Sequence, residues 1–183
     1  LNTPAVFKGS FARPNLVYVN RETETKKEAI LEIIKRVPGS GIVYVRNRKE
    51  TQNIAFWLRE QGISADHYHA GLGMSDRKNK QDFWTNNKTR IIVSTNAFGM
   101  GIDKPDVRFV IHYDIPKSIE NYYQETGRGG RDGLEGRCVA FYSEKDVTRL
   151  EKFLRDKPAA EREMGMLLMQ EITAYAETTA CRR

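Results

Sequence analysis

Short runs of consecutive apolar residues alternate along the chain with segments whose apolar residues recur at helical spacing. Runs of the first kind are typical of strands that are buried on both faces of a parallel sheet. They fall at residues 16–19, 42–45, 91–94, 109–112 and 138–142, with a weaker candidate at residues 65–69. The alternation predicts an α/β fold in which helices cover both faces of a parallel sheet.

Residues that favour helix starts and stops bound the segments between these runs. Thr25 and Glu28 have the spacing of a capping box, ahead of apolar residues at helical spacing that end at Pro38. Ser75 and Ser118 are each expected to cap a helix, because a serine hydroxyl can accept from the free amides of the first turn. The predicted helices cover residues 26–37, a segment around residues 54–61, residues 75–85 and residues 119–126.

The C-terminal part of the chain follows a different pattern, with two helical segments and no strand between them. These segments cover residues 145–154 and 162 to about 179. We therefore expect a first unit over residues 1–143 and a helical extension over residues 144–183. An apolar stripe at helical spacing is predicted on the second helix, made of Met164, Leu168, Ile172 and Tyr175.

The composition of the chain favours some classes of binding partner over others. The chain carries 30 Lys and Arg against 24 Asp and Glu, a net charge of +6, which favours an anionic partner, nucleic acid first among them. Cys138 and Cys181 do not make a disulfide framework, and Cys138 lies in an apolar run, as expected of an inert core residue. No apolar run reaches the length of a membrane span, so no membrane association is expected. The chain starts at Leu1 rather than Met, so we expect it to be part of a longer protein.

Two glycine-rich stretches, residues 94–108 and 124–133, are the strongest candidates for chemistry. In the second, Arg128 and Arg131 stand three residues apart, among five glycines between residues 127 and 136. Glycine lets a backbone approach a ligand closely, and an arginine fork matches phosphate oxygens. Arginines presented in this way can neutralise the γ-phosphate in phosphoryl transfer. The alternative is two surface arginines in a solvated loop.

The sequence has no nucleotide-binding loop of its own. It contains no Gly-x-x-x-x-Gly-Lys-Ser/Thr stretch and no paired carboxylates typical of a magnesium site, so another domain must hold ATP if these arginines serve it. The loops after residues 94 and 113 leave the carboxyl ends of predicted strands, where ligands bind in open α/β sheets. His67 and His69 share one face of a predicted strand, but a metal site needs more ligands than these two.

Several stretches together carry a resemblance to a known family. Residues 95–108 (Thr-Asn-Ala-Phe-Gly-Met-Gly-Ile-Asp-Lys-Pro-Asp-Val-Arg) and 124–133 (Gln-Glu-Thr-Gly-Arg-Gly-Gly-Arg-Asp-Gly) are similar to helicase motifs V and VI. Residues 42–48 (Ile-Val-Tyr-Val-Arg-Asn-Arg) resemble motif IV, and residues 68–71 (Tyr-His-Ala-Gly) resemble motif IVa. The chain thereby resembles the second RecA-like domain of RecQ-type ATP-dependent DNA helicases, in helicase superfamily 2. Residues 10–16 resemble the segment that enters this domain, and residues 176–183 resemble the start of the RecQ zinc-binding subdomain.

The resemblance implies a RecA-like parallel sheet flanked by helices, with a helical extension that leads into a zinc-binding subdomain. It implies the C-terminal motor domain of a 3′ to 5′ DNA helicase, with roles in DNA repair and recombination. ATP and Mg²⁺ would be held mainly by a preceding RecA-like domain of the same protein, with Arg128 and Arg131 reaching across to the γ-phosphate and Arg131 favoured as the finger. Residues expected near the nucleotide are Gln124, Gly101 and Asp103. Residues expected to hold the DNA backbone are Thr95, Ser94, Asn47, Arg48, His69 and Gly71. By the same resemblance, Cys181 would be the first ligand of Zn²⁺ in the full-length protein.

Three features depart from the family pattern. Val45 and Asn47 stand where many RecQ proteins have Cys and Ser, so an amide replaces a hydroxyl that could contact phosphate, although Asn can also donate. Gly129 stands where alanine is usual, which should loosen the loop. The zinc ligands that would accompany Cys181 are missing, so the chain by itself should not hold zinc stably.

Two other functions stay open on the sequence alone. A non-catalytic nucleic-acid-binding module would share the fold, and its full-length protein would lack a partner ATP-binding domain. A superfamily 2 RNA helicase would carry a histidine-led motif VI where this chain has Gln124, and competition between single-stranded DNA and RNA separates these cases. If the helicase interpretation holds, the chain alone should show no ATP turnover and weak, salt-sensitive DNA binding. We expect a cytoplasmic, nucleoid-associated location in bacteria and a nuclear one in eukaryotes.

Overall fold

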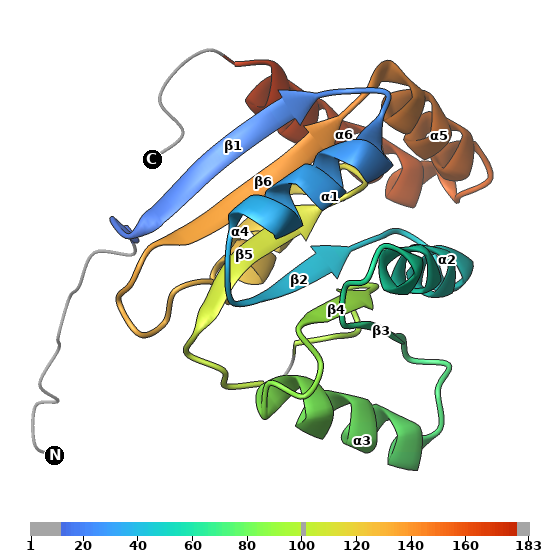
Figure 1. Ribbon diagram of the computed structural model, residues 1–183. Coiled ribbons are helices and arrows are strands. Elements are labelled where there is room, and N and C mark those ends of the chain that lie inside the picture. The colour runs from blue at the N-terminus through green and yellow to red at the C-terminus, as the bar shows by residue number, and fades with distance from the viewer. Residues whose placement is uncertain (1–11, 100–101, 179–183) are drawn as a thin grey trace, which may run out of the picture.

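A six-stranded sheet forms the centre of the computed structural model, which describes residues 12–99 and 102–178 (Figure 1). The strand order is β1-β6-β5-β2-β4-β3, and neighbouring strands run parallel throughout. The predicted α/β class with a parallel sheet is confirmed. The strands are β1 (Leu16–Glu22), β2 (Ser40–Tyr44), β3 (Ala65–Tyr68), β4 (Ile91–Ser94), β5 (Val107–His112) and β6 (Gly136–Tyr142).

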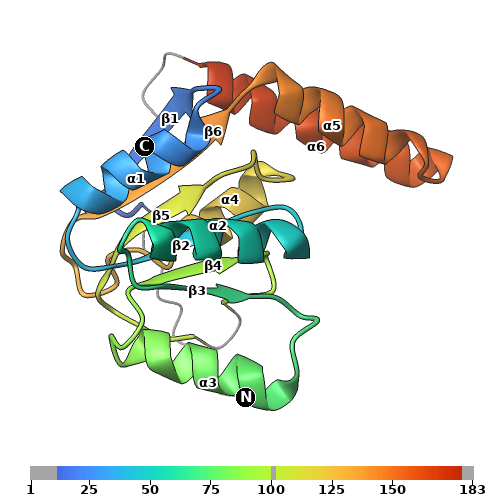
Figure 2. The same ribbon diagram turned by 45° about the vertical axis from the view of Figure 1, so that its right-hand side comes forward.

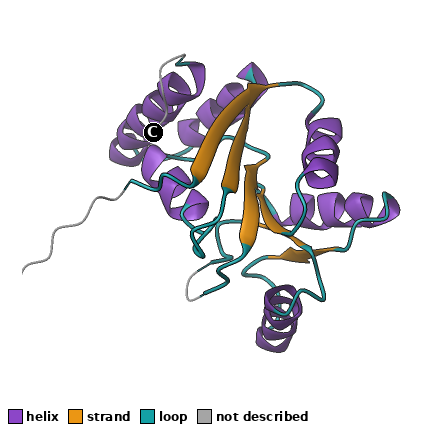
Figure 3. Ribbon diagram, turned by 60° about the vertical axis from the view of Figure 1, so that its left-hand side comes forward, coloured by secondary structure: helices purple, strands orange, loops and turns teal. Residues whose placement is uncertain are grey.

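The described residues form six helices that cover both faces of the sheet. In Figure 1, α1 lies in front of the strands and α4 lies behind them, and Figure 3 shows helices on both sides of the sheet. Burial on both faces explains why the strands read as continuous apolar runs instead of alternating ones. The helices are α1 (Lys26–Arg36), α2 (Arg48–Glu60), α3 (Met74–Thr85), α4 (Ile119–Thr126), α5 (Glu144–Arg155) and α6 (Ala159–Glu177).

The two faces of the sheet have separate cores. On one face, α1 and α2 bring Ile34 and Leu58 against alternate strand residues such as Val43. On the other face, Trp84 of α3 and Phe98 of the stretch after β4 pack against the intervening strand residues. Phe98 and Ile102 therefore tie parts of the first glycine-rich stretch into the core.

The C-terminal helices α5 and α6 form a hairpin at the end of the sheet that carries β1 and β6 (Figure 2). Leu150 of α5 and Met169 and Ile172 of α6 are buried in this contact. The predicted stripe is wrong at Met164, which is 58% exposed, because the first turns of α6 lie against α5 alone and extend past the sheet. A buried ion pair between Lys26 and Asp146, with Nζ 2.5 Å from Oδ2, also joins α1 to α5.

Two of the predicted helix caps are wrong. Thr25 precedes α1, but its side chain makes no capping hydrogen bond, and its hydroxyl lies 3.3 Å from that of Thr23 instead. Helix α3 begins one residue before Ser75, after Gly73, so Ser75 lies within the first turn. The Thr25 hydroxyl has a local partner in Thr23, and Ser75 lies inside the helix instead of ahead of it. Residue spacing alone does not reveal either alternative.

Two predictions about single residues are confirmed. Ser118 caps α4, because its hydroxyl accepts from the amide of Asn121 at 3.2 Å. Cys138 is fully buried in β6, and burial raises the pKa of its thiol to about 12, so the thiol stays protonated and inert at neutral pH. None of the helices in the described part of the chain combines the length and apolar character that a membrane span requires.

Candidate functional site

The two glycine-rich stretches meet on the face of the sheet that carries α4. The first passes from the end of β4 to the start of β5, so it crosses from the carboxyl edge of the sheet to the amino edge. The second follows α4 at the amino edge, where the Gly130 amide donates to the Val107 carbonyl at 2.9 Å. The Asp132 amide likewise donates to the Pro105 carbonyl at 3.2 Å. The structure therefore brings together two stretches that are separate in the sequence.

Arg131 extends from the second stretch over the end of the first. Its Nη1 donates to the carbonyl of Ile102 at 3.1 Å and to Oδ1 of Asp103 at 3.2 Å. The side chain of Asp103 is 86% exposed and that of Arg131 is 36% exposed. An ion pair this exposed contributes little free energy, so Arg131 can exchange Asp103 for another anion at small cost.

Arg128 has a different environment, although it lies only three residues earlier. Its Nη1 donates to the carbonyl of Gly99, and its Nε is buried without a hydrogen-bond partner among the described residues. Gly99 has a φ of +138°, and a Cβ atom at this position would overlap the Arg128 guanidinium. Glycine is therefore required here both by the backbone conformation and by the arginine that fills the space beside it.

The other residues predicted near the nucleotide are less closely grouped. Gln124 is exposed on α4, with its Nε2 3.5 Å from Oε1 of Glu120. Asp103 contacts Arg131 directly. Gly101 lies outside the described residues. The structure therefore brings Asp103 to the arginine, and it shows no contact between Gln124 and Arg131 within the described residues.

Three of the residues predicted to hold DNA form a cluster at the carboxyl edge of the sheet. A Cβ atom on Gly71 would lie 2.8 Å from Nη1 of Arg48 and 3.3 Å from Nδ1 of His69, so the glycine allows both side chains to approach. Burial and the nearby Arg48 charge lower the pKa of His69, which keeps its ring neutral at neutral pH. Its Nδ1 has no hydrogen-bond partner among the residues that the structure describes. The cluster presents one positive charge and one neutral ring at this edge of the sheet.

The remaining predicted DNA contacts divide into two kinds. Asn47 is exposed, and its Oδ1 accepts from the Glu50 amide at 2.9 Å, which caps α2 and leaves the side-chain amide hydrogens free to donate. Thr95 is 9% exposed at the end of β4. The prediction for Ser94 is wrong, because this residue is fully buried and its hydroxyl lies 2.9 Å from the Tyr68 carbonyl. Ser94 therefore joins β4 to β3 and does not reach the surface.

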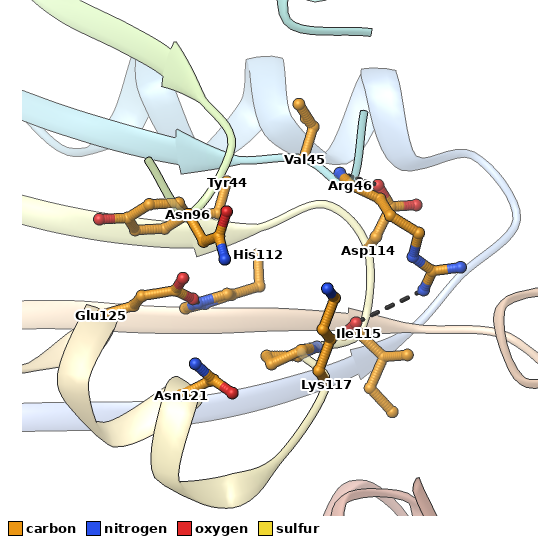
Figure 4. A pocket seen from close by; sticks show the side chains of 11 residues that line it. Tyr44, Val45, Arg46, Asn96, His112, Asp114, Ile115, Lys117, Asn121 and Glu125 are labelled. Atoms are coloured by element: carbon orange, nitrogen blue, oxygen red, sulfur yellow. Dashed lines mark hydrogen bonds and ion pairs between the residues drawn. The ribbon is translucent and has the colours of Figure 1, made fainter. Parts of the chain in front are cut away.

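A polar pocket, whose side chains were not among the predicted site residues, lies beside this edge, between the ends of β2 and β5 and the start of α4. Figure 4 shows Asn96, Lys117 and Asn121 around the same space, with His112 and Glu125 along one side. Nε2 of His112 lies 2.7 Å from Oε2 of Glu125. The sequence held a signal for part of this pocket, since Asn96 and Asp114 come two residues after the apolar runs that end at residues 94 and 112, whereas Asn121 and Glu125 reach it from α4.

The described residues do not assemble a metal site. Residues 12–99 and 102–178 contain no group of three or more His, Cys, Asp or Glu side chains that could hold a metal ion. The rings of His67 and His69 lie 5.8 Å apart, and Asp66 is near His67, but within those ranges these side chains do not come together as a group of three that could hold an ion. Cys181 lies outside the described residues, so its predicted role as a zinc ligand stays a prediction.

The chain is similar to known proteins over most of its length. The helicase conserved C-terminal domain family matches residues 25–133. The whole chain is 44% identical to the ATP-dependent DNA helicase RecQ of Pasteurella multocida strain Pm70, and it covers 29% of that protein. Over 97% of the chain it is also 44% identical to the RecQ-like DNA helicase blm-1 of Caenorhabditis elegans, of which it covers 19%. The chain thus spans less than a third of the length of these relatives.

Two solved structures resemble the described fold. A DEAD box protein from the hyperthermophile Methanococcus jannaschii gives a TM-score of 0.63 at 28% identity, over 75% of this chain and 38% of that one. The E. coli DEAD-box protein SrmB, bound to regulator of ribonuclease activity A, gives a TM-score of 0.62 at 28% identity, over 79% and 85% of the two chains. The predicted RecA-like fold is confirmed by these matches, whereas the zinc-binding subdomain stays a prediction.

Proposed function

The chain belongs to the helicase conserved C-terminal domain family, in its RecQ-type branch, and from this we propose that it is the second motor domain of a longer ATP-dependent DNA helicase. ATP would bind between this domain and a preceding RecA-like domain, which would hold the nucleotide phosphates and Mg²⁺. The described residues contribute no acidic cluster of their own for the ion. What this chain supplies is the arginine and the DNA-facing edge of the shared site.

The observation that carries the proposal is the placement of Arg131. Its guanidinium is anchored at one nitrogen by the Ile102 carbonyl, and its ion pair with Asp103 is exposed. An incoming γ-phosphate can replace the Asp103 carboxylate, because both are oxygen anions that match the guanidinium fork. Positive charge at this point stabilises the charge that develops during phosphoryl transfer, an effect worth about 10³ to 10⁵ in rate for arginine fingers.

The carboxyl edge of the sheet supports the assignment of DNA as the second ligand. Asn47, Arg48 and the His69 loop lie at the ends of β2 and β3, and Thr95 lies at the end of the adjacent strand β4. Contacts of this kind to phosphates fix a strand in place without reading its sequence. The preference for DNA over RNA rests on the DNA helicases to which the chain is similar. Closure of the two motor domains on ATP and opening after hydrolysis would then step them along the strand.

Roles in DNA repair and recombination, and a location at the nucleoid or in the nucleus, follow from the same membership. Zinc would require ligands in the longer protein in addition to Cys181, and none of the steps proposed here passes through it.

The test is an Arg131→Ala change in the full-length protein. We expect DNA-stimulated ATP hydrolysis to fall by about 10³-fold or more, because the charge that stabilises the γ-phosphate is lost. The matched control is Arg137→Ala, which removes an arginine with a 54% exposed side chain on β6. Hydrolysis by the Arg131 variant within a few-fold of the control would show that Arg131 is not the finger.

A further inference from the structure

Two consecutive carbonyls of the first glycine-rich stretch are each held by a side chain from a different element. The Tyr44 hydroxyl, at the end of β2, donates to the Phe98 carbonyl at 3.0 Å. The Arg128 guanidinium, just after α4, donates to the Gly99 carbonyl. Phe98 and Gly99 are both buried. A buried carbonyl without a partner is costly, so the shape of this stretch depends on both donors.

Tyr44 is suited to act as a permanent donor. Burial raises the pKa of its hydroxyl, and the Arg128 charge offsets only part of this rise, so the proton stays on Tyr44 at neutral pH. The Tyr44 ring also stacks on His112, with ring centroids 5.2 Å apart. His112 is itself paired with Glu125 of α4 (Figure 4). The hydroxyl is thus fixed in direction by the same side chains that line the polar pocket.

The two hydrogen bonds lie in the middle of the first glycine-rich stretch, between its two ends. Thr95 and Asn96 precede them at the carboxyl edge, beside the residues proposed to hold DNA. Ile102 and Asp103 follow them and contact Arg131, the residue proposed to contact ATP. The two carbonyls therefore lie between the DNA end and the nucleotide end of one continuous segment.

We infer that Arg128 is a positioning residue, which together with Tyr44 fixes the segment between the DNA and nucleotide ends and so makes ATP hydrolysis depend on bound DNA. The inference rests on the proposed function, which supplies the ligands at the two ends. It differs from the expectation that Arg128 contacts the γ-phosphate. If the Arg128 guanidinium moved away from Gly99 toward a phosphate, the buried Gly99 carbonyl would lose its donor, whereas Arg131 would give up only an exposed ion pair.

The test compares Tyr44→Phe and Arg128→Lys with Arg131→Ala in the full-length protein. ATP hydrolysis is measured as a function of single-stranded DNA concentration and, separately, of ATP concentration. For Tyr44→Phe we expect the DNA concentration for half-maximal activation to rise roughly 2- to 10-fold, the effect of one hydrogen bond, with the KM for ATP within about two-fold. Arg128→Lys should shift DNA activation in the same direction and further. A matched control is Tyr123→Phe, which removes a hydroxyl from a tyrosine that is 45% exposed on α4.

A second variant tests the same contact with Arg128 in place. Gly99→Ala should displace the guanidinium and reproduce the shift in DNA activation seen with Arg128→Lys. If the alanine prevents folding, as judged by circular dichroism, Tyr44→Phe still decides the question, because it removes a single oxygen atom.

Two results would overturn the inference. The first is an Arg128→Lys protein that loses activity at saturating DNA as completely as Arg131→Ala, with an unchanged DNA requirement, since this is the behaviour of a direct phosphate contact. The second is DNA activation like that of the wild type in both Tyr44→Phe and Arg128→Lys, together with an inactive Arg131→Ala protein. This result would contradict the inference but would still agree with the proposed function. If Arg131→Ala were itself active, the proposed function would fail instead.

Discussion

The two glycine-rich stretches use glycine for opposite purposes. In the first, residues 94–108, Gly99 leaves room for a side chain from elsewhere, and the Arg128 guanidinium occupies it. In the second, residues 124–133, Gly130 and Gly133 have φ values of +52° and +83°, so they let the backbone turn sharply. The first stretch receives an arginine at the buried Gly99, whereas the second presents Arg131, whose side chain is 36% exposed.

The two stretches are nevertheless held by the same kind of bond. Arginine side chains donate to carbonyls in both, Arg128 in the first and Arg13 in the second. Arg13 lies more than a hundred positions away in the sequence and reaches the carbonyls of Gly127, Gly129 and Gly130 at 3.3, 3.0 and 3.0 Å. Hydrogen bonds from distant arginines to these carbonyls restrict the backbone of a loop that is rich in glycine.

The largest effect on the second stretch is expected from Arg13→Ala. Three carbonyls lose a charged donor at once, so the free energy of unfolding should fall by about 3 kcal/mol, measured by urea denaturation. The control is Arg21→Ala, which breaks an exposed ion pair with Glu32 and should change stability by less than about 0.5 kcal/mol. Equal effects of the two changes would mean that Arg13 does not hold this stretch.

An intermediate loss of stability is expected from an alanine substitution at Gly130 but not from one at the neighbouring Gly129. Gly130→Ala places a Cβ atom 2.5 Å from the Leu134 carbonyl oxygen on a left-handed backbone, and should cost about 2 kcal/mol. At Gly129 the nearest atoms would lie 3.4 Å away and φ is ordinary, so Gly129→Ala should change stability by less than about 1 kcal/mol, toward greater stability. The midpoints of thermal unfolding report both. A large loss from Gly129→Ala would contradict the expectation that alanine fits this position.

The smallest effect concerns the end of the first stretch, where Lys104 is buried and its Nζ lies 2.8 Å from Oδ1 of Asp106. Burial alone would raise the pKa of Asp106, but the Lys104 ammonium outweighs it and the pKa is lowered. Because the pKa of Asp106 is lower in the folded state, the stabilisation by its ion pair with Lys104 is fully present above the pKa of Asp106 in the unfolded chain. The contribution is then lost as the pH falls through the lower, folded value.

Asp106→Asn should therefore reduce the loss of stability between about pH 5 and pH 3, by no more than about 1 kcal/mol because Asp106 is 46% exposed. Urea denaturation at the two pH values measures it. An unchanged acid dependence in the variant would show that the ion pair does not fasten this end of the stretch.

Most of the sheet could be predicted from the sequence, because burial on both faces leaves continuous apolar runs. Strand β1 is longer than predicted, since Asn20, Arg21 and Glu22 extend it as polar residues of an edge strand paired with β6. The carboxyl-edge rule for parallel sheets pointed to the loops after residues 94 and 113, and the polar pocket lies between them. The proximity of Arg48 to His69 was expected only from the family resemblance. The carboxyl-edge rule gave no indication that Ser94 points inward, because a hydroxyl can be satisfied by a carbonyl of the neighbouring strand.

The environments of the two arginines could not be predicted from the sequence. Spacing and glycine content treat Arg128 and Arg131 alike, but their directions depend on Gly99, Asp103 and the Ile102 carbonyl, 28 or 29 positions away. The sequence indicates only that Tyr44 belongs to a strand, because the hydrogen bond from its hydroxyl to Phe98 forms once β2 and the first stretch are folded together.

Residues 95–106 connect the carboxyl end of β4 to the amino end of β5, so the two ends of this segment are separated by the height of the sheet. Strands β4 and β5 have four and six residues, so at about 3.3 Å per residue the sheet is roughly 13 to 20 Å high. Because a strand cannot be compressed or stretched without breaking its hydrogen bonds, the two ends of the segment are held apart by a rigid spacer. If the domain rotated by a small angle as one body, the displacements of the two ends would keep a constant ratio, because the distance between the ends does not change.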